Sequence, residues 1–167
     1  MDEIKLGVIG TGSVVREIYC YLYFKSDYSK IIKVEALCDT NEKNMNEFGD
    51  TYNIPKARRF TDYKKMVKEV KLDAVQVNTP DAYHKDPAIF ALENGLDVMV
   101  PKPTADRIID AHDMIEKAIE TKKLLAIDFH KREDPRIKEA KTRFQKGDYG
   151  EFQSSVWYML DKLMVSD

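Results

Sequence analysis

The sequence predicts an α/β fold built on a doubly wound parallel sheet. Short apolar runs alternate with helix-like segments along the whole chain, as they do in consecutive βαβ units. The first run, residues 4–9, breaks into the glycine turn Gly10-Thr11-Gly12, and a helical pattern follows at once. A second strand-like run, residues 35–39, ends in the carboxylate of Asp39. The length of 167 residues allows one such domain and the start of another.

In the first half of the chain, local signals set the ends of the elements. Pro55 ends a polar helix, because the residue before a proline disfavours helical backbone. Thr61 or Asp62 is suited to cap the helix that follows. The expected elements are, in order, a helix at 13–24, the strand ending at Asp39, a helix at 42–51, a short extended piece at 58–60 and a helix reaching Val70.

The second half repeats the alternation of strand and helix. Asn94-Gly95 is a good helix C-terminal cap. The expected elements are strands at 73–77, 97–100 and 124–129, and helices at 87–93, 104–122 and from Asp134 or Pro135 to about Gly147. The long helix at 104–122 carries a run of apolar residues on one face, namely Ile108, Ala111, Ile115, Ala118 and Ile119.

The bulk composition limits the class of protein. With 43% hydrophobic and 34% charged residues, it is that of an ordinary globular chain. The 27 basic and 29 acidic residues give a formal net charge of −2, so we expect no nucleic-acid partner. No apolar run approaches the roughly 18 residues of a membrane span, and Cys20 and Cys38 lack metal-ligand spacing. We expect a cytoplasmic protein with no membrane contact and no bound metal.

The glycine turn has the features that a dinucleotide pyrophosphate needs. Gly10 allows the tight turn after the strand, and Gly12 lets the backbone approach the phosphates without a Cβ in the way. Ser13 and Val14 open the next helix, whose free N–H groups and positive dipole end face the anion. Asp39 lies 24 residues after Val15. This is close to the spacing of roughly 20 residues expected between the glycine motif and the acidic residue that binds the ribose hydroxyls.

Some features of this turn leave alternatives open. Val15 stands at the third glycine position, where Gly or Ala normally permits close packing of helix on strand. An ordinary strand–turn–helix corner would also use these glycines, and Asp39 could simply form a turn at a strand end. As a ribose ligand, Asp39 favours NAD, because a carboxylate repels a 2′-phosphate, whereas the nearby Lys43 keeps NADP open.

Motifs further along the chain resemble a known family. The segment 78–103 carries Thr79-Pro80, His84, Ala91-Leu92-Glu93-Asn94-Gly95 and Lys102-Pro103. Together with Gly10-Thr11-Gly12 and Asp39, it resembles the glucose–fructose oxidoreductase / inositol dehydrogenase (Gfo/Idh/MocA) family of NAD(P)-dependent enzymes. Residues 129–135 and 147–152 look like that family's passage out of its nucleotide domain, so the resemblance covers essentially the whole chain.

The resemblance implies a domain organisation. It implies a six-stranded NAD(P)-binding Rossmann domain followed by an α/β domain that binds substrate and often mediates oligomerisation. We expect the Rossmann domain to occupy residues 1–150 and residues 151–167 to begin an incomplete second domain, so that the chain is truncated. An apolar strand expected at 151–160 could pair with another copy and give a homo-oligomer.

The resemblance also implies roles for individual residues. Lys102 matches the family lysine that acts near the reacting carbinol and the nicotinamide, and Pro103 matches a proline whose preceding bond is often cis in relatives. The expected cofactor-binding residues are Gly10, Thr11, Gly12, Ser13, Val14, Asp39, Asn78, Thr79, Pro80, His84, Lys102 and Pro103.

For several of these positions a structural role competes with the functional one. Thr79-Pro80 could be a simple loop entry, and His84 could stabilise its loop. His130 and Arg132 could lie at the edge of the site or in solvent.

The chain departs from the family at two points. Pro101 replaces the usual glutamate before the lysine, and the family's partner Asp and His for proton relay have no counterpart here. The leading hypothesis is an NAD(P)-dependent oxidoreductase, or its nucleotide-binding half, that transfers hydride between nicotinamide and a secondary alcohol or ketone of a sugar- or polyol-like substrate. This chain alone is expected to show negligible turnover. The alternative is a non-catalytic dinucleotide-binding module that senses NAD(H) or docks a partner.

Overall fold

The computed structural model describes residues 3–151, 153–154, 156 and 158. Contacts divide the chain into two units, of which the first runs to Asp128 and the second begins at Phe129. The strands are β1 (Ile4–Ile9), β2 (Ile32–Cys38), β3 (Arg59–Phe60), β4 (Ala74–Val77), β5 (Asp97–Pro101) and β6 (Leu125–Asp128). The helices of the first unit are η1 (Val15–Tyr19), α1 (Cys20–Phe24), η2 (Asp27–Lys30), α2 (Glu42–Thr51), η3 (Lys56–Arg58), α3 (Tyr63–Glu69), η4 (Asp81–Tyr83), α4 (Lys85–Glu93) and α5 (Ile108–Thr121).

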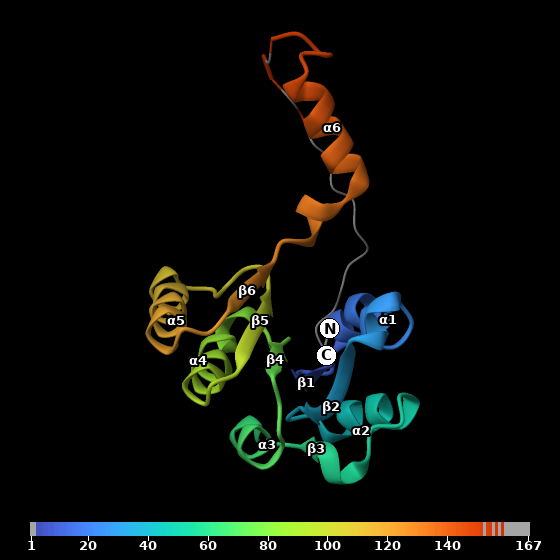
Figure 1. The fold of residues 1–167 in the computed structure, drawn as a ribbon, viewed down its shortest axis with the longest axis vertical. Coiled ribbons are helices and arrows are strands. Elements are labelled where there is room, and N and C mark those ends of the chain that lie inside the picture. The colour runs from blue at the N-terminus through green and yellow to red at the C-terminus, as the bar shows by residue number, and fades with distance from the viewer. Residues whose placement is uncertain (1–2, 152, 155, 157, 159–167) are drawn as a thin grey trace. The chain divides into compact units, whose positions relative to one another are not determined.

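The six strands form one parallel sheet in the order β3-β2-β1-β4-β5-β6 (Figure 1). The chain runs outward from β1 to β3, crosses back to β4 on the other side of β1, and continues to β6. The order therefore reverses between β1 and β4. In open α/β sheets, the crevice beyond the carboxyl ends of the strands at such a point is where ligands bind. The predicted doubly wound parallel sheet is confirmed.

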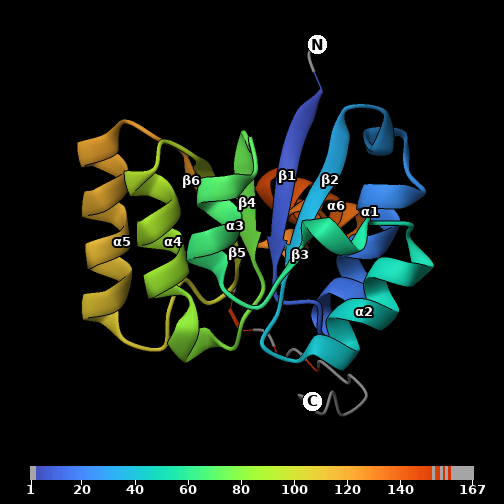
Figure 2. The same ribbon diagram turned by 90° about the horizontal axis from the view of Figure 1, so that it is seen from below.

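Helices cover the two faces of this sheet (Figure 2). One core cluster joins η1, α1 and α2 to the sheet through Val15, Tyr19, Tyr23, Met45 and Phe48. The other joins α3, α4 and α5 to the opposite face and includes Met66, Val67, Ala88, Ala91, Leu92 and Met114. Successive β1 residues alternate between the clusters, because side chains of a strand point to opposite faces in turn.

The helix predicted at residues 13–24 forms, with a π-helical segment, η1, at its centre. This segment begins at Val15, the residue at the third glycine position, and Val15 is completely buried in the core between helix and sheet. Such π-helical turns inside helices are rare and occur frequently at functional sites.

The long helix α5 differs from the prediction at its start. It begins at Ile108 rather than at residue 104, because Arg107 is extended. The carbonyl oxygen of Thr104 lies 3.2 Å from Nδ1 of His84. The buried residues of α5 are Met114 and Ala118. The isoleucines of the predicted apolar face are not among these buried residues: Ile108 is 92% exposed and Ile119 is 72% exposed.

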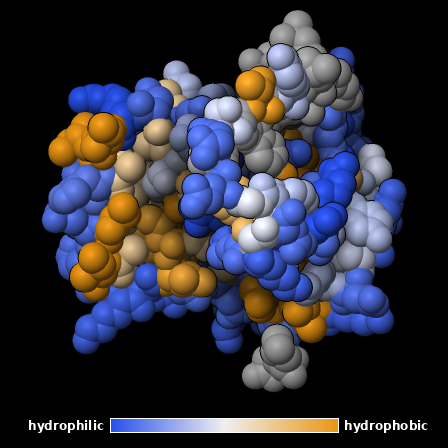
Figure 3. Space-filling view, turned by 90° about the horizontal axis from the view of Figure 1, so that it is seen from above, coloured by the Kyte–Doolittle hydropathy of each residue, from blue (hydrophilic) through white to orange (hydrophobic). Residues whose placement is uncertain are grey.

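The exposed isoleucines border an apolar groove between α5 and β6. The groove has a volume of about 270 Å³ and is lined by Thr104, Ile115, Ala118, Ile119, Lys123, Leu125 and Ile127. Figure 3 shows hydrophobic side chains gathered on the left of one face of the molecule, the side on which α5 lies in Figure 1.

The second unit contains η5 (His130–Glu133) and α6 (Pro135–Gln145). The helix α6 starts at Pro135, one of the two starts predicted, and Asp134 caps it, since its carboxylate accepts hydrogen bonds from the backbone and side chain of Arg136. The strand expected at 151–160 falls mostly on residues outside those described, and the predicted domain boundary at residue 150 stays a prediction. No helix within the described residues is both long enough and apolar enough to span a membrane.

Candidate functional site

The carboxyl ends of β1, β2 and β4 meet around Gly10. Its backbone N–H donates to the carbonyl of Cys38 at 2.8 Å, and the N–H of Asn78 donates to the carbonyl of Ile9 at 2.6 Å. Gly10 has a φ of +87°, and a Cβ there would lie 2.6 Å from the carbonyl oxygen of Asn78. Only glycine fits this turn without strain, so the strand-to-helix turn is held close to β4.

Gly12 differs from Gly10, because a Cβ built on it would meet no atom of the described residues within 4 Å. Its position therefore borders open space, while Ser13 and Val14 behind it begin the helix. The first N–H groups of a helix have no intrahelical partner, and they carry its positive dipole end. The turn thus leaves unhindered space for an anion directly in front of a helix N-terminus.

Asp39 lies just beyond β2 and binds the glycine turn. Its Oδ2 accepts the backbone N–H of Thr11 at 2.7 Å and the hydroxyl of Thr11 at 2.8 Å, and its Oδ1 accepts the N–H of Asn41 at 2.9 Å. Thr11 is completely buried. A carboxylate has about four acceptor positions, so Oδ1 retains one for a further donor. Asp39 therefore fixes the turn, and its Oδ1 keeps one acceptor position that no residue in the described part of the chain fills.

The loop after β4 carries Asn78, Thr79 and Pro80. The hydroxyl of Thr79 donates to the carbonyl of Tyr83 at 3.0 Å, which closes the loop onto η4. His84 follows η4 and is completely buried. Its Nε2 lies 2.9 Å from the carbonyl oxygen of Thr79, and its Nδ1 lies 3.2 Å from that of Thr104.

Lys102 and Pro103 follow the carboxyl end of β5. Both are exposed, and the peptide bond between them is cis. Lys102 makes no ion pair or side-chain hydrogen bond with another residue in the described part of the chain. Its ammonium group is therefore available to a bound ligand. His130 and Arg132, by contrast, belong to the second unit.

Sequence reasoning missed a set of polar side chains on the α1 face of the sheet. The hydroxyl of Tyr19 donates to Oδ2 of Asp128 at 2.6 Å. The hydroxyl of Tyr23 bonds Oε1 of Gln76, whose Nε2 donates to Oδ1 of Asn78 at 2.9 Å. Burial raises the pKa of both phenols above the ordinary value, which keeps them neutral hydrogen-bond donors. The available signals were Gln76 within an apolar strand and Asp128 at the end of β6.

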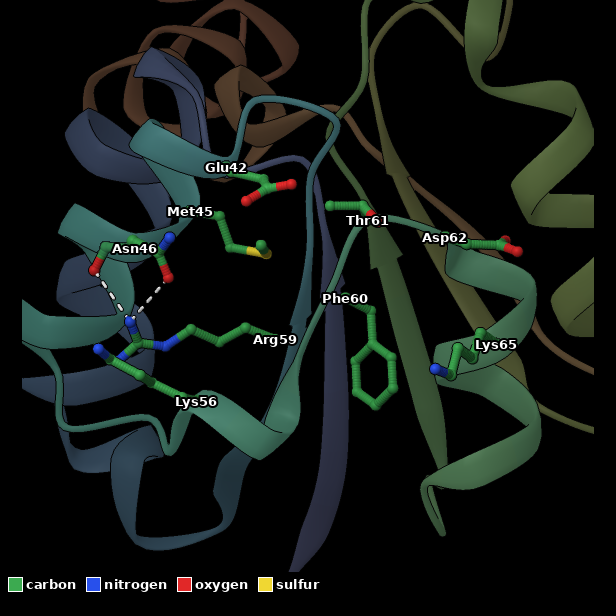
Figure 4. A pocket seen from close by; sticks show the side chains of 9 residues that line it. All are labelled: Glu42, Met45, Asn46, Lys56, Arg59, Phe60, Thr61, Asp62 and Lys65. Carbon is green, nitrogen blue, oxygen red and sulfur yellow. Dashed lines mark hydrogen bonds between the residues drawn. The ribbon is translucent and has the colours of Figure 1, made fainter.

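A cavity of about 350 Å³ lies beside the edge strand β3, between α2 and α3 (Figure 4). The lining residues are Glu42, Met45, Asn46, Lys56, Arg59, Phe60, Thr61, Asp62 and Lys65. The guanidinium of Arg59 is engaged by the carbonyl of Ile54, by Asn46 and by the carboxylate of Asp50. Arg59 therefore has a structural role. None of the predicted site residues lines the cavity.

A family model described as an oxidoreductase family with an NAD-binding Rossmann fold, GFO_IDH_MocA, matches residues 4–129. D-glucoside 3-dehydrogenase of Escherichia coli is 29% identical over 131 residues, which cover 78% of this chain and 36% of that enzyme. Inositol 2-dehydrogenase of Rubrobacter xylanophilus is 28% identical over 143 residues, or 83% of this chain and 40% of that enzyme. The chain thus spans about two fifths of the length of these relatives.

Solved structures share the fold. Scyllo-inositol dehydrogenase from Lactobacillus casei, solved with NAD(H) and scyllo-inositol, aligns with a TM-score of 0.79 at 21% identity over 90% of this chain and 43% of that one. An oxidoreductase from Thermotoga maritima aligns with a TM-score of 0.82 at 22% identity, over 89% and 45% of the two chains. From its family match and its motifs, the chain belongs to the Gfo/Idh/MocA oxidoreductase family, and it carries that family's NAD-binding Rossmann domain.

Proposed function

We propose that the carboxyl edge of the sheet binds NAD(H) through the residues that the sequence indicated. The pyrophosphate lies over Gly10, Thr11 and Gly12, in front of the helix that begins at Ser13 and Val14. The adenosine ribose lies at Asp39, and the nicotinamide end extends toward Asn78, Thr79, Pro80, Lys102 and Pro103. The observation that carries this proposal is the contrast within the turn, where Gly10 is packed against Asn78 while Gly12 faces open space.

The free acceptor position of Asp39 favours NAD over NADP. Its Oδ1 accepts one backbone hydrogen bond, so a ribose hydroxyl can donate to the position that remains. A 2′-phosphate would bring negative charge against this carboxylate. Lys43 lies near Asp39 in the sequence and is exposed in the first turn of α2. Its positive charge would offset part of the repulsion between Asp39 and the phosphate. We therefore infer a preference for NAD rather than an absolute exclusion of NADP.

Lys102 is the proposed catalytic residue. Bound NAD would accept a hydride from a carbinol carbon, and the oxygen of that carbinol develops negative charge as its proton leaves. In the reverse direction, the reduction of a ketone, an ammonium group beside this oxygen stabilises the charge that develops there and donates the proton that converts it to the hydroxyl. Lys102 suits this role because it is exposed at the carboxyl end of β5 with its ammonium group unpaired among the described residues.

The proposed substrate is a sugar- or polyol-like secondary alcohol or the corresponding ketone. The relatives named above act, by their names, on a glucoside and on inositol. We infer that groups from a further domain position this substrate, because positioning can be worth about 7–11 kcal/mol of the barrier. On this view, residues 1–150 bind the coenzyme, residues 151–167 begin the further domain, and this chain alone turns over substrate negligibly.

Calorimetric titration with NAD⁺, NADH and NADPH tests the proposal. We expect NAD⁺ and NADH to bind the wild type, and NADPH to bind more weakly. The Asp39→Ala variant should lose most of the affinity for NADH, and a melting curve of the variant separates a lost ligand contact from lost folding. Absence of binding by all three coenzymes to the folded wild type would contradict the proposal.

A further inference from the structure

Arg16 joins the glycine turn to the helix that follows Asp39. It is the second residue of η1 and is half-buried. Its Nε donates to the carbonyl oxygen of Thr11 at 3.0 Å, and its Nη2 donates to that of Asn44, in α2, at 2.7 Å. The guanidinium carbon lies 5.9 Å from the centre of the Phe48 ring, which is buried under α2. Because a guanidinium is planar and rigid, these contacts fix the distance between the turn and α2.

The two carbonyls belong to a closed ring of hydrogen bonds that also contains Asp39. On one side, Oδ2 of Asp39 accepts the N–H and the hydroxyl of Thr11. On the other side, Oδ1 of Asp39 accepts the N–H of Asn41 at 2.9 Å, and Oδ1 of Asn41 accepts the N–H of Asn44 at 3.1 Å. Arg16 closes the ring between Thr11 and Asn44. All these bonds can exist at once, because arginine carries five N–H donors and the carboxylate and carbonyl oxygens accept.

We propose that Arg16 is a positioning residue, which sets the distance between the glycine turn and the carboxylate of Asp39. The inference rests on the proposed function, because it assigns the pyrophosphate to the turn and the adenosine ribose to Asp39. These two groups are neighbours in one coenzyme, so both are bound at full strength only when their binding sites lie at the matching separation. Arg16 acts on this separation through Thr11 and Asn44 and needs no contact of its own with the coenzyme.

The dissociation constant for NADH, measured with two variants of Arg16, separates positioning from charge. Arg16→Lys keeps the positive charge, but a single ammonium cannot replace the planar fork that spans both carbonyls. Arg16→Met removes the charge and every donor. We expect both variants to weaken NADH binding about tenfold, the effect of losing roughly one net hydrogen bond to the ligand. Wild-type affinity in Arg16→Lys would overturn the inference, because the charge alone would then be sufficient.

A double-mutant cycle with Asp39→Ala tests whether Arg16 acts through the ribose site. The separation that Arg16 sets no longer matters once the ribose carboxylate is gone. We therefore expect Arg16→Lys to weaken NADH binding by less than about twofold in the Asp39→Ala background. A further tenfold loss in that background would mean that the two residues act independently, and it would overturn the inference.

Arg59→Lys is the matched control, because Arg59 also ties α2 to a neighbouring segment, through Asn46 and the carbonyl of Ile54. In the described part of the chain, Arg59 forms no hydrogen bond with the glycine turn. We expect this variant to have a lower Tm but a dissociation constant for NADH within about twofold of the wild type. Equal weakening of NADH binding in Arg59→Lys and Arg16→Lys would overturn the inference, since general loosening of α2 would then explain both.

The outcome for the wild type separates this inference from the proposed function. A folded wild type that binds no NADH would overturn the proposed function, and this inference with it. A wild type that binds NADH, loses affinity in Asp39→Ala and keeps it in both Arg16 variants would overturn the inference alone. Melting curves identify the variants that are folded at the temperature of the titration, and Arg16→Lys is the milder of the two.

Discussion

Alanine substitution should lower the stability of the fold at Gly10 and the affinity for NADH at Gly12, although the two residues belong to the same turn. At Gly10 a side chain would have to adopt a φ of +87° and would place its Cβ 2.6 Å from the carbonyl oxygen of Asn78. A left-handed backbone costs a non-glycine residue about 1–2 kcal/mol, and relieving the overlap adds about 1–3 kcal/mol. We expect Gly10→Ala to lower the free energy of unfolding by about 3 kcal/mol.

At Gly12 a Cβ would meet no atom of the described residues within 4 Å, and the backbone is not in the left-handed region. Alanine there should leave the free energy of unfolding within about 0.5 kcal/mol, or raise it slightly by restricting the unfolded chain. The same methyl group would occupy the space proposed for the pyrophosphate. We therefore expect Gly12→Ala to weaken NADH binding at least about tenfold, or about 1.4 kcal/mol.

Thermal melts and NADH titrations of the two variants check both halves of this prediction. A loss of about 3 kcal/mol should lower the Tm of Gly10→Ala by about 6–12 °C for a chain of this size. The Gly12→Ala variant should melt close to the wild type and yet bind NADH at least about tenfold more weakly. A Gly10→Ala variant with an unchanged Tm would refute the geometry of the turn. A Gly12→Ala variant with wild-type affinity for NADH would refute the position of the pyrophosphate.

Three further predictions concern the rest of the domain. Met114→Ala should cost about 2–5 kcal/mol in urea unfolding, whereas Ile119→Lys on the exposed face of α5 should cost less than about 0.5 kcal/mol; equal costs would contradict the observed orientation of this helix. Arg59→Lys should lose about 2–4 kcal/mol, because an ammonium cannot span the oxygens that the planar guanidinium binds, and a Tm like that of the wild type would count against this. Burial raises the pKa of the Cys38 thiol from 9.0 to about 12, so between these values the thiol ionises only when the chain unfolds. The free energy of unfolding should therefore be unaffected by this thiol below pH 9 and should fall as the pH rises toward 12. The loss of stability with rising pH should be smaller in Cys38→Ala. An identical pH profile of urea midpoints in the two proteins would show that Cys38 does not cause it.

The elements governed by local chemistry were predictable from the sequence. Asp62 caps α3 through a hydrogen bond from Lys64, Asn94 and Gly95 end α4, and the parallel sheet follows from the alternation of strands and helices. The glycine turn and Asp39 were likewise predictable, because their roles depend on backbone conformation and on position at a strand end.

Features that depend on distant partners were not predictable. The helix α5 starts at Ile108, after the extended Arg107, and Thr104 lies against His84, which is 20 residues earlier. Tyr19 and Asp128 are separated by 109 residues, so no local pattern could pair them. The burial of His84 similarly depends on two loops that meet only in the folded sheet. In each case, tertiary contacts decided what sequence periodicity left open.

Binding of NAD(H) across the carboxyl edge of the sheet, at the glycine turn, can be measured residue by residue. The experiment is a titration of the ¹⁵N-labelled chain with NADH, followed in NMR spectra of assigned backbone amides. We predict the largest shifts at Thr11, Gly12, Asp39 and Thr79. The largest shifts at residues 56–65, around the cavity beside β3, or no shifts at saturating NADH, would contradict it.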